Sequence, residues 1–490
     1  MRARTLTAVS LVIATLVASA RSGEAQAAGR LPSPPAGGQD AGRALVERVA
    51  TAMGGRERLL AVRTLLLHGS GDAFRLGQAA TPEADLPRVA ITSRRHAIDF
   101  ANRRWALDET RERRAAAGTV TSERQRTAYD AVAFDLIDDT TARRAAARED
   151  ADRADELLQH PIGFMQLALA PGADLAVSTG EAGVRLLHMA IAGFRFDMAV
   201  DPATMLPVRI ARAMYHPVLG DVILSSHFSD WRLVDSVRVP MRVARRLDAR
   251  WTIADIRIDS ARIDDGVGDL AAPASVLEAE PPAPVVVVLT EEVAPGVWHL
   301  TGQSHHSVVI EMADHLLLVE APQTDARTLA VIGLARALRP EKPLRAVVNT
   351  HHHFDHAGGL RAAIAEGLTV ITHEGNRVFV DSLAARRHHL VADALAARPR
   401  VPHIEAVDER HVITHGTTVA LHHVRGSPHA QTMLMVYVPA ARLLIAADLS
   451  PAELVANVDR LGLDVERIVP LHGRITPMSA LRAQAAAGRR

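Results

Sequence analysis

A histidine-rich segment in the second half of the chain has the residue types that bind metal ions. Residues 349–359 read NTHHHFDHAGG and place His351, His353, Asp355 and His356 within six residues. So many donors on so short a segment cannot all point one way along a helix or a strand, so they predict a loop that turns them toward one point. The interruption by Asp355 argues against a chance histidine run, which is the plain alternative.

The segments on either side of this loop predict where it lies in the fold. The apolar run at 344–348 predicts a buried strand, and helix formers follow Gly359. The loop is therefore expected at the carboxyl end of a strand, where the active sites of α/β sheets collect.

Three further donors also lie where a predicted strand meets a loop. His429 stands in a turn before a strand at 433–438, Asp448 follows a strand at 443–446, and His472 follows a short strand at 468–469. The chain has no cysteine, which excludes disulfides, cysteine nucleophiles and thiolate ligands. Any metal must therefore be held by imidazole and carboxylate groups.

Composition and patterning divide the 490 residues into five parts. Residues 1–27 have a basic start, a short apolar core and small-residue cleavage sites, which predicts a secretory signal peptide and a periplasmic protein. A permanent N-terminal anchor is the alternative. Residues 28–43 predict a flexible leader, 44–268 a β-rich domain of unknown role, 269–289 a proline-rich linker, and 290–490 a domain in which strands and helices alternate.

The β-rich part predicts an antiparallel sheet shaped as an open barrel or half-barrel. A helix is expected at 44–53, followed by strands at 64–71, 88–92, 96–100 and 118–127. A helical interruption at 153–169 precedes more strands between 184 and 259. Together with the strands and helices expected over 290–490, this part predicts the fold class α+β.

Charge gives little indication of a macromolecular partner. Lys+Arg and Asp+Glu are equal at 56 each, so nothing favours nucleic acid or an anionic surface. No apolar run after the signal peptide approaches the roughly 20 residues of a spanning helix. The expected partner is a small-molecule substrate, and the oligomeric state stays open.

The order of the donors resembles that of the metallo-β-lactamase-fold hydrolases. The shared pattern is His-x-His-x-Asp-His, a distant His after a glycine turn, a strand-terminal Asp and a His-Gly pair. The resemblance covers about 290–490 and implies an αββα sandwich with two Zn²⁺ ions, iron and manganese being the alternatives. It implies that His351, His353 and His429 hold the first ion, that Asp355, His356 and His472 hold the second, and that Asp448 bridges them.

The implied chemistry is hydrolysis by a hydroxide that bridges two metal ions. Three protein ligands leave a zinc ion open to water, and two ions about 3.5–4 Å apart lower the pKa of a shared water. Asp355 is the expected catalytic residue, which would orient the nucleophile or pass on its proton. Because Asp448 stands where β-lactamases of this fold tend to have cysteine or serine, an ester, thioester or lactone is the expected substrate, as in glyoxalase II-like enzymes.

Three alternatives stay open at this stage. An iron ion at a single site would give an oxidoreductase like the persulfide dioxygenases. A β-lactamase is the second alternative, although the type with a cysteine ligand is excluded. The third is a periplasmic ligand-binding protein whose metal site is not catalytic.

Several residues near the pattern have roles that the sequence leaves less defined. Glu320-Ala-Pro322 stands where this fold often has Asp-Thr-Gly, which is expected to change the bracing beneath the metals. His305 and His306 are expected at the mouth of the site, more as solvated loop residues than as substrate contacts. His373 is expected to support the fold. A helix over 381–397 would carry Arg386, Arg387, His388 and His389, either over the metal cleft or as a solvated face.

Overall fold

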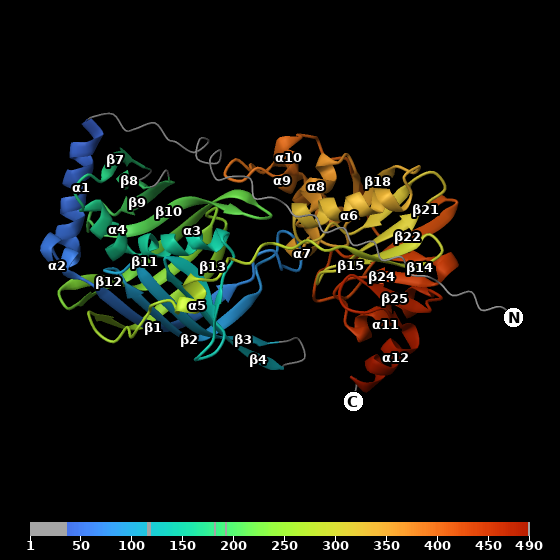
Figure 1. The fold of residues 1–490 in the computed structure, drawn as a ribbon, viewed down its shortest axis with the longest axis horizontal. Coiled ribbons are helices and arrows are strands. Elements are labelled where there is room, and N and C mark those ends of the chain that lie inside the picture. The colour runs from blue at the N-terminus through green and yellow to red at the C-terminus, as the bar shows by residue number, and fades with distance from the viewer. Residues whose placement is uncertain (1–36, 115–118, 181–182, 192–193, 489–490) are drawn as a thin grey trace.

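The computed structural model describes residues 37–114, 119–180, 183–191 and 194–488. The predicted signal peptide and the first part of the predicted leader lie outside the described residues. The described chain forms a curved β-rich part and a two-sheet sandwich that lie side by side (Figure 1). None of the helices in these ranges is both long and apolar enough to cross a membrane.

The N-terminal part is built on one 13-stranded sheet. Its strands follow the order β6-β5-β4-β3-β2-β1-β13-β12-β11-β10-β9-β8-β7. In chain order they are β1 (Thr64–Phe74), β2 (Arg88–Asp99), β3 (Arg104–Arg114), β4 (Val120–Asp130), β5 (Val132–Leu136), β6 (Ala142–Arg144), β7 (Asp174–Thr179), β8 (Arg185–Ile191), β9 (Phe194–Val200), β10 (Pro207–His216), β11 (Gly220–Val234), β12 (Val237–Leu247) and β13 (Trp251–Ile263). Because β6 and β7 are both edge strands, the barrel is open.

Glycines in β1 allow this sheet to bend sharply. The register of β1 shifts against β13 between His68 and Gly69 and against β2 between Gly69 and Gly71. A Cβ on Gly69 would lie 2.1 Å from the carbonyl oxygen of Arg257, so only glycine permits this approach. Such bulges increase local twist and bend the strand.

Helices cover part of the curved sheet. They are α1 (Gly37–Met53), α2 (Arg56–Ala61), α3 (Arg148–Ala154), η1 (Asp155–Gln159) and α4 (Pro161–Ala168). Val49 and Met53 of α1 and Phe164 of α4 are buried in one apolar core with strand residues such as Met198. The sheet and η1 also line a cavity of about 530 Å³.

The C-terminal part consists of a seven-stranded and a six-stranded sheet. The first runs β14 (Leu289–Ala294), β15 (Val297–Thr301), β16 (Ser307–Glu311), β17 (Leu316–Val319), β18 (Leu344–Val348), β19 (Thr369–His373) and β20 (Ile404–Val407). The second runs β21 (Arg410–His415), β22 (Thr417–His423), β23 (Leu434–Val438), β24 (Leu443–Ala446), β25 (Arg467–Pro470) and β26 (Thr476–Pro477). The short helix α5 (Ala274–Leu277) lies in the proline-rich segment before β14.

Three apolar clusters define four layers in this part. Residues of both sheets, such as Ile310 and Val436, form the central cluster. Helices α6 (Asp325–Leu338), α8 (Leu360–Ala365) and α9 (Arg377–Ala385) pack on the first sheet, and α11 (Pro451–Leu461) and α12 (Met478–Ala487) pack on the second. The predicted αββα class is thus confirmed, after a β-rich N-terminal part.

The structure corrects several expected elements. Helix α1 begins at Gly37, within the predicted leader, and β2 is one strand where two were expected. Strands β3 and β7 and helix α11 were not predicted. The expected helix over 381–397 is wrong, because α9 ends at Ala385 and the short α10 (Ala394–Ala397) begins after a non-helical loop. The domain boundaries themselves stay predictions.

Candidate metal centre

The histidine-rich loop follows β18 and leads into the short helix α7 (Phe354–Ala357). Gly358 and Gly359 follow α7, at a place where neighbouring residues leave no room for a side chain. A Cβ on Gly359 would lie 1.8 Å from Oγ1 of Thr328, and one on Gly358 would lie 2.2 Å from the carbonyl oxygen of Gln323. This close packing on the start of α6 holds the loop at the carboxyl end of β18.

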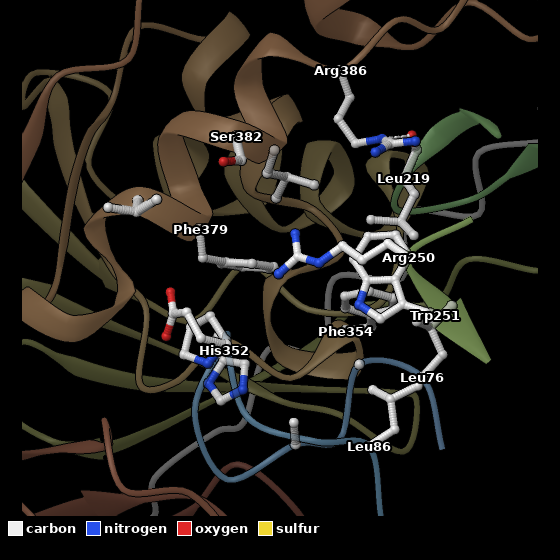
Figure 2. Close-up of a pocket in the computed structure, with 16 residues that line it drawn as sticks. Leu76, Leu86, Leu219, Arg250, Trp251, His352, Phe354, Phe379, Ser382 and Arg386 are labelled. Atoms are coloured by element: carbon white, nitrogen blue, oxygen red, sulfur yellow. Dashed lines mark hydrogen bonds between the residues drawn. The ribbon is translucent and has the colours of Figure 1, made fainter. Parts of the chain in front are cut away.

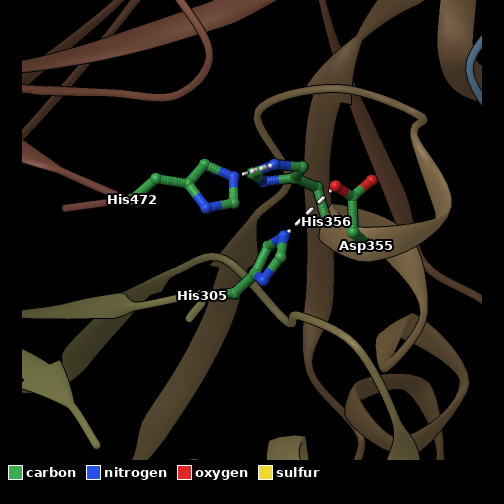
Figure 3. A group of neighbouring side chains, drawn as sticks. All are labelled: His305, Asp355, His356 and His472. Atoms are coloured by element: carbon green, nitrogen blue, oxygen red, sulfur yellow. Dashed lines mark hydrogen bonds and ion pairs between the residues drawn. The ribbon is translucent and has the colours of Figure 1, made fainter. Parts of the chain in front are cut away.

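All seven predicted ligands meet at one place and separate into two groups. The first group contains His351, His353, His429 and Asp448, and the second contains Asp355, His356 and His472 together with His305. Within each group every pair of candidate donor atoms lies within 4.8 Å. Figure 3 shows the second group, whose side chains converge from helix α7 and from two loops.

Asp448 lies between the two groups. Its Oδ2 is 3.4 Å from Nε2 of His351 and 3.1 Å from Nε2 of His429 in the first group. The same oxygen is 2.9 Å from Nε2 of His356, and Oδ1 is 3.1 Å from Nε2 of His472, in the second. A carboxylate that faces both groups has the position expected of a bridging ligand.

In three of the rings, the nitrogen that faces away from the centre donates to a fixed acceptor. Nδ1 of His356 donates to Oε2 of Glu320 (2.9 Å), and Nδ1 of His472 donates to the carbonyl oxygen of Ser304 (3.2 Å). Nε2 of His353 donates to the carbonyl oxygen of Ala79 (2.9 Å). These contacts fix the tautomers, so that Nε2 of His356 and His472 and Nδ1 of His353 face the site.

Glu320 supports the candidate centre through hydrogen bonds to the histidine-rich segment. It is buried, with a left-handed backbone (φ 77°) directly after β17. Besides His356, it accepts hydrogen bonds from Oγ1 of Thr350 (2.5 Å) and Nδ2 of Asn349 (3.1 Å). The departure noted at 320–322 thus leaves a carboxylate beneath the candidate centre, where it orients the ring of His356.

His305 is a member of the second group that the sequence did not indicate. We expected a solvated loop histidine, but Nε2 of His305 lies 3.1 Å from Oδ2 of Asp355. Its ring centroid is 4.0 Å from that of His472. The expectation failed because the sequence gives no sign that the loop after β15 folds back over α7.

The N-terminal part also contributes to the centre, through the β1–β2 loop (residues 75–87), which reaches α7 (Figure 1). Nε2 of Gln78 donates to Oδ1 of Asp355 (2.9 Å), and Ala79 accepts from His353. The backbone NH of Phe354 donates to the carbonyl oxygen of Gly77 (3.2 Å). A Cβ on Gly77 (φ +72°) would lie 2.3 Å from the Phe354 ring, so this contact requires glycine.

The same loop borders a pocket of about 120 Å³ between the two parts (Figure 2). Leu76 and Leu86 face Phe354 and Phe379 across it, and Trp251 lies at one side. The pocket touches His352 and Phe354, the two neighbours of His353 in the chain. The β1–β2 loop therefore packs against the histidine-rich segment, both through its hydrogen bonds and around this pocket.

The charges of the centre favour a bound cation. Burial raises the pKa of Asp355, but the hydrogen bond from His305 and the charge of His356 outweigh it and hold that pKa well below its usual range. Burial lowers the pKa of His356, but hydrogen bonds to Asp448 and Glu320 raise it to about 10. A cationic imidazole thus compensates the surrounding carboxylates, and a metal ion would replace its proton.

The residues fit the metal that the resemblance implied. Nδ1 of His353 is buried and has no hydrogen-bond partner among the described residues. His351, His353 and His356 are buried, while His429, Asp448 and His472 are half-buried, so the centre opens toward solvent on one side. Imidazole and carboxylate donors in this number suit Zn²⁺ and related divalent ions.

The other candidate residues lie away from the two groups. Nη2 of Arg386 donates to Oδ2 of Asp248 (2.6 Å) and Asp221 NH to the carbonyl oxygen of Arg387 (2.8 Å), so the loop after α9 binds the N-terminal sheet and does not cover the metal cleft. His388 contacts Asp393 and Tyr215. Nδ1 of His373 accepts from the backbone NH of Gly375 (3.0 Å), as a supporting residue would.

Comparison with protein families gives a match within the C-terminal part. Residues 300–483 match the Metallo-beta-lactamase superfamily. That range contains every predicted ligand and both sheets of the sandwich except β14 and the first part of β15. This part of the chain is therefore a metallo-beta-lactamase superfamily domain, and members of that superfamily bind metal ions.

Solved structures are similar to part of the chain. A metallo-beta-lactamase from Pontibacter korlensis is 17% identical, with 41% of this chain and 99% of that chain covered at a TM-score of 0.33. One from Hirschia baltica is 19% identical, with 41% and 96% covered at 0.32. The inverting sec-alkylsulfatase Pisa1 from Pseudomonas sp. is 18% identical, with 40% of each chain covered at 0.32. Comparison with curated proteins gave no match.

Proposed function

We propose that the protein is a metal-dependent hydrolase that binds two Zn²⁺ ions and cleaves an ester, thioester, lactone or related bond. The observation that carries the proposal is the meeting of all seven predicted donors in two adjacent groups, with Asp448 facing both. His351, His353 and His429 would hold one ion, and Asp355, His356 and His472 the other. When bound, the ions would lower the pKa of a shared water and polarise the bond that is cleaved.

The chain's own residues prepare this chemistry by fixing the donors. Glu320, Ser304 and Ala79 orient three rings through the nitrogens that face away from the centre. Asp355 keeps its charge at neutral pH because its pKa lies well below the usual range. A carboxylate that stays ionised is a weak base, so Asp355 serves to bind and orient and takes up a proton only transiently.

A substrate panel tests the proposal. Zinc-loaded protein is assayed on chromogenic esters, thioesters, lactones and β-lactams, with metal content measured on the same sample. We expect turnover of at least one of the first three classes, its loss in Asp355→Ala, and its retention in Asp381→Ala, a matched change on the exposed side of α9. Turnover of β-lactams alone would favour the β-lactamase alternative, and one iron without zinc would favour the oxidoreductase.

A second function, ligand binding in the N-terminal part, is favoured by the cavity of about 530 Å³. Its walls combine apolar residues such as Ile91, Phe228 and Ile256 with buried ionic residues. We propose that a small amphipathic molecule occupies it. The probe is anilinonaphthalene sulfonate, whose binding should weaken in Ala254→Phe, which would narrow the cavity, and stay unchanged in Asp355→Ala.

The place of action also stays a proposal. We propose a periplasmic enzyme on the basis of residues 1–27, which a fractionation of cells that express the full chain would test. The same experiment would separate cleavage of the signal from retention of an anchor by the size of the mature protein.

A further inference from the structure

We propose that His305 is an additional protein ligand of the second metal site, which would then have four donors of its own. The proposal rests on the metal sites proposed above but not on which bond is hydrolysed. Nε2 of His305 belongs to the group in which all candidate donor atoms lie within 4.8 Å of one another. Figure 3 shows its ring turned toward Asp355, with the ring of His472 beside it.

Two pairs of these donors have the spacing of neighbouring ligands on one zinc ion. Zinc ligands at 2.0–2.1 Å from the ion lie about 3.3 Å from one another. Nε2 of His305 is 3.1 Å from Oδ2 of Asp355, and the Nε2 atoms of His356 and His472 are 2.9 Å apart. Two ring nitrogens at such a distance share one proton at most, and an ion between the four donors would satisfy them all.

The ring of His305 can present a free lone pair at Nε2. Its Nδ1 lies 3.0 Å from Oγ of Ser304, and that hydroxyl can accept a hydrogen bond from Nδ1 or donate one to it. With the proton on Nδ1, Nε2 is a metal donor. With the proton on Nε2, His305 donates to Asp355. The hydroxyl of Ser304 therefore supports the ring both before and after an ion binds.

The backbone around His305 is held rigidly. Arg327 is buried and donates to the carbonyl oxygens of Thr301 (3.0 Å) and His305 (3.2 Å). The backbone NH of His306 donates to the carbonyl oxygen of Leu471 (2.9 Å), next to His472. The loop is thus tied to the strand end that carries another ligand, which keeps the two imidazoles together without an ion.

The alternative is that His305 only orients Asp355 through a hydrogen bond. Both roles predict weaker activity in a variant, so activity cannot separate them. The position of the zinc ion can, because a ligand lies about 2.0–2.1 Å from it and a hydrogen-bond partner of another ligand does not.

The test combines metal titration with a crystal structure of zinc-loaded wild-type protein. A chromophoric chelator competes for zinc in the wild type, in His305→Ala and in His403→Ala, whose exposed imidazole lies outside both groups. We expect two equivalents in the wild type, a second site weakened at least about 10-fold in His305→Ala, and no change in His403→Ala. In the crystal structure Nε2 of His305 should lie within bonding distance of the ion.

Each contrary result has a distinct meaning. Two equivalents of zinc with Nε2 of His305 more than about 3 Å from the second ion would overturn this proposal and leave the hydrolase proposal standing. One equivalent, bound at the first group, would overturn both. Because the structure is of the wild type, the decision does not depend on whether His305→Ala folds.

Discussion

Nδ1 of His356 donates to Oε2 of Glu320 across 2.9 Å, and both side chains are fully buried. This contact places a carboxylate directly behind an imidazole that faces Asp448 with its other nitrogen. Such a partner fixes the ring and makes it a stronger ligand. Glu320, which is not a metal ligand in the proposed arrangement, therefore fixes the orientation of a residue that is one.

Replacement of Glu320 by glutamine should weaken the second zinc ion. Glu320→Gln keeps the size of the side chain but removes the charge that supports His356. We expect the affinity of the second site to fall about 10–100-fold, the usual effect of losing such a partner. Competition with a chromophoric chelator measures it, and Glu374→Gln, an exposed change on η3 (Glu374–Asn376), is the control. Equal affinities in the two variants would show that Glu320 does not support the ligand.

Loss of the Gln78 side chain should reduce activity although Gln78 lies in the N-terminal part. Its amide donates to Asp355 and accepts from Nη2 of Arg75 (3.0 Å), so its orientation is fixed. A hydrogen bond to a charged group contributes about 1.5–3 kcal/mol, which corresponds to roughly 10-fold or more in kcat/KM if Asp355 shifts. The measurement uses the best substrate of the panel, with Gln125→Ala on the exposed face of β4 as control. Unchanged kcat/KM in Gln78→Ala would mean that Asp355 is held without it.

A methyl group at Gly77 should loosen the contact between the two parts of the chain. Gly77→Ala combines an unfavourable left-handed backbone with a clash against Phe354, whereas Gly172→Ala has a similar φ of +80° and open space around it. The difference between the two variants isolates the clash. We expect Gly77→Ala to speed amide hydrogen exchange in residues 75–87 and 351–356, with Gly172→Ala like the wild type there. Slow exchange in both variants would contradict the docking of this loop.

His96 should make the protein less stable in acid. Burial, with a smaller effect from Arg94, lowers the pKa of His96 to about 3. The unfolded chain takes up this proton below about pH 6.5, so the stability is present above that pH and is lost as pH falls toward 3. At pH 5 the loss from one such histidine is about 2 kcal/mol.

Urea unfolding at pH 7.5 and pH 5.0 checks this pH dependence. The loss of unfolding free energy between the two pH values should be about 2 kcal/mol smaller in His96→Gln than in the wild type. Burial raises the pKa of Asp155 to about 6, so this residue makes the protein more stable as the pH falls. That effect is the same in both proteins. His403→Gln is the exposed control. An equal loss in wild type and His96→Gln would show that His96 takes up no extra proton on unfolding.

How much the sequence predicts differs between the two parts. The strands Leu344–Val348 and Leu443–Ala446 were predicted with their observed bounds, because buried strands of a sandwich are apolar runs with clear ends. Strand β3 was missed because its inward face carries Glu109 and Arg111, which form an ion pair in place of apolar contacts. Because these inward-facing residues are charged, the sequence of β3 does not alternate between apolar and polar residues.

The candidate site shows a similar limit. Seven donors could be predicted because each stands at a strand end in a recognisable order. His305 could not, since it becomes a neighbour of Asp355 only through the fold of its loop. Gln78 is 277 residues from Asp355 in the chain, and no local pattern predicts such a contact.

The proposed hydrolysis depends on two metal ions bound at this centre. Zinc is added back stepwise to metal-free protein, and bound zinc per chain is measured together with turnover of the best substrate. Activity should rise with zinc to two equivalents, and Asp448→Ala, which removes the residue between the groups, should lose it. Full activity in the metal-free protein, or activity that follows one bound iron without zinc, would contradict this dependence.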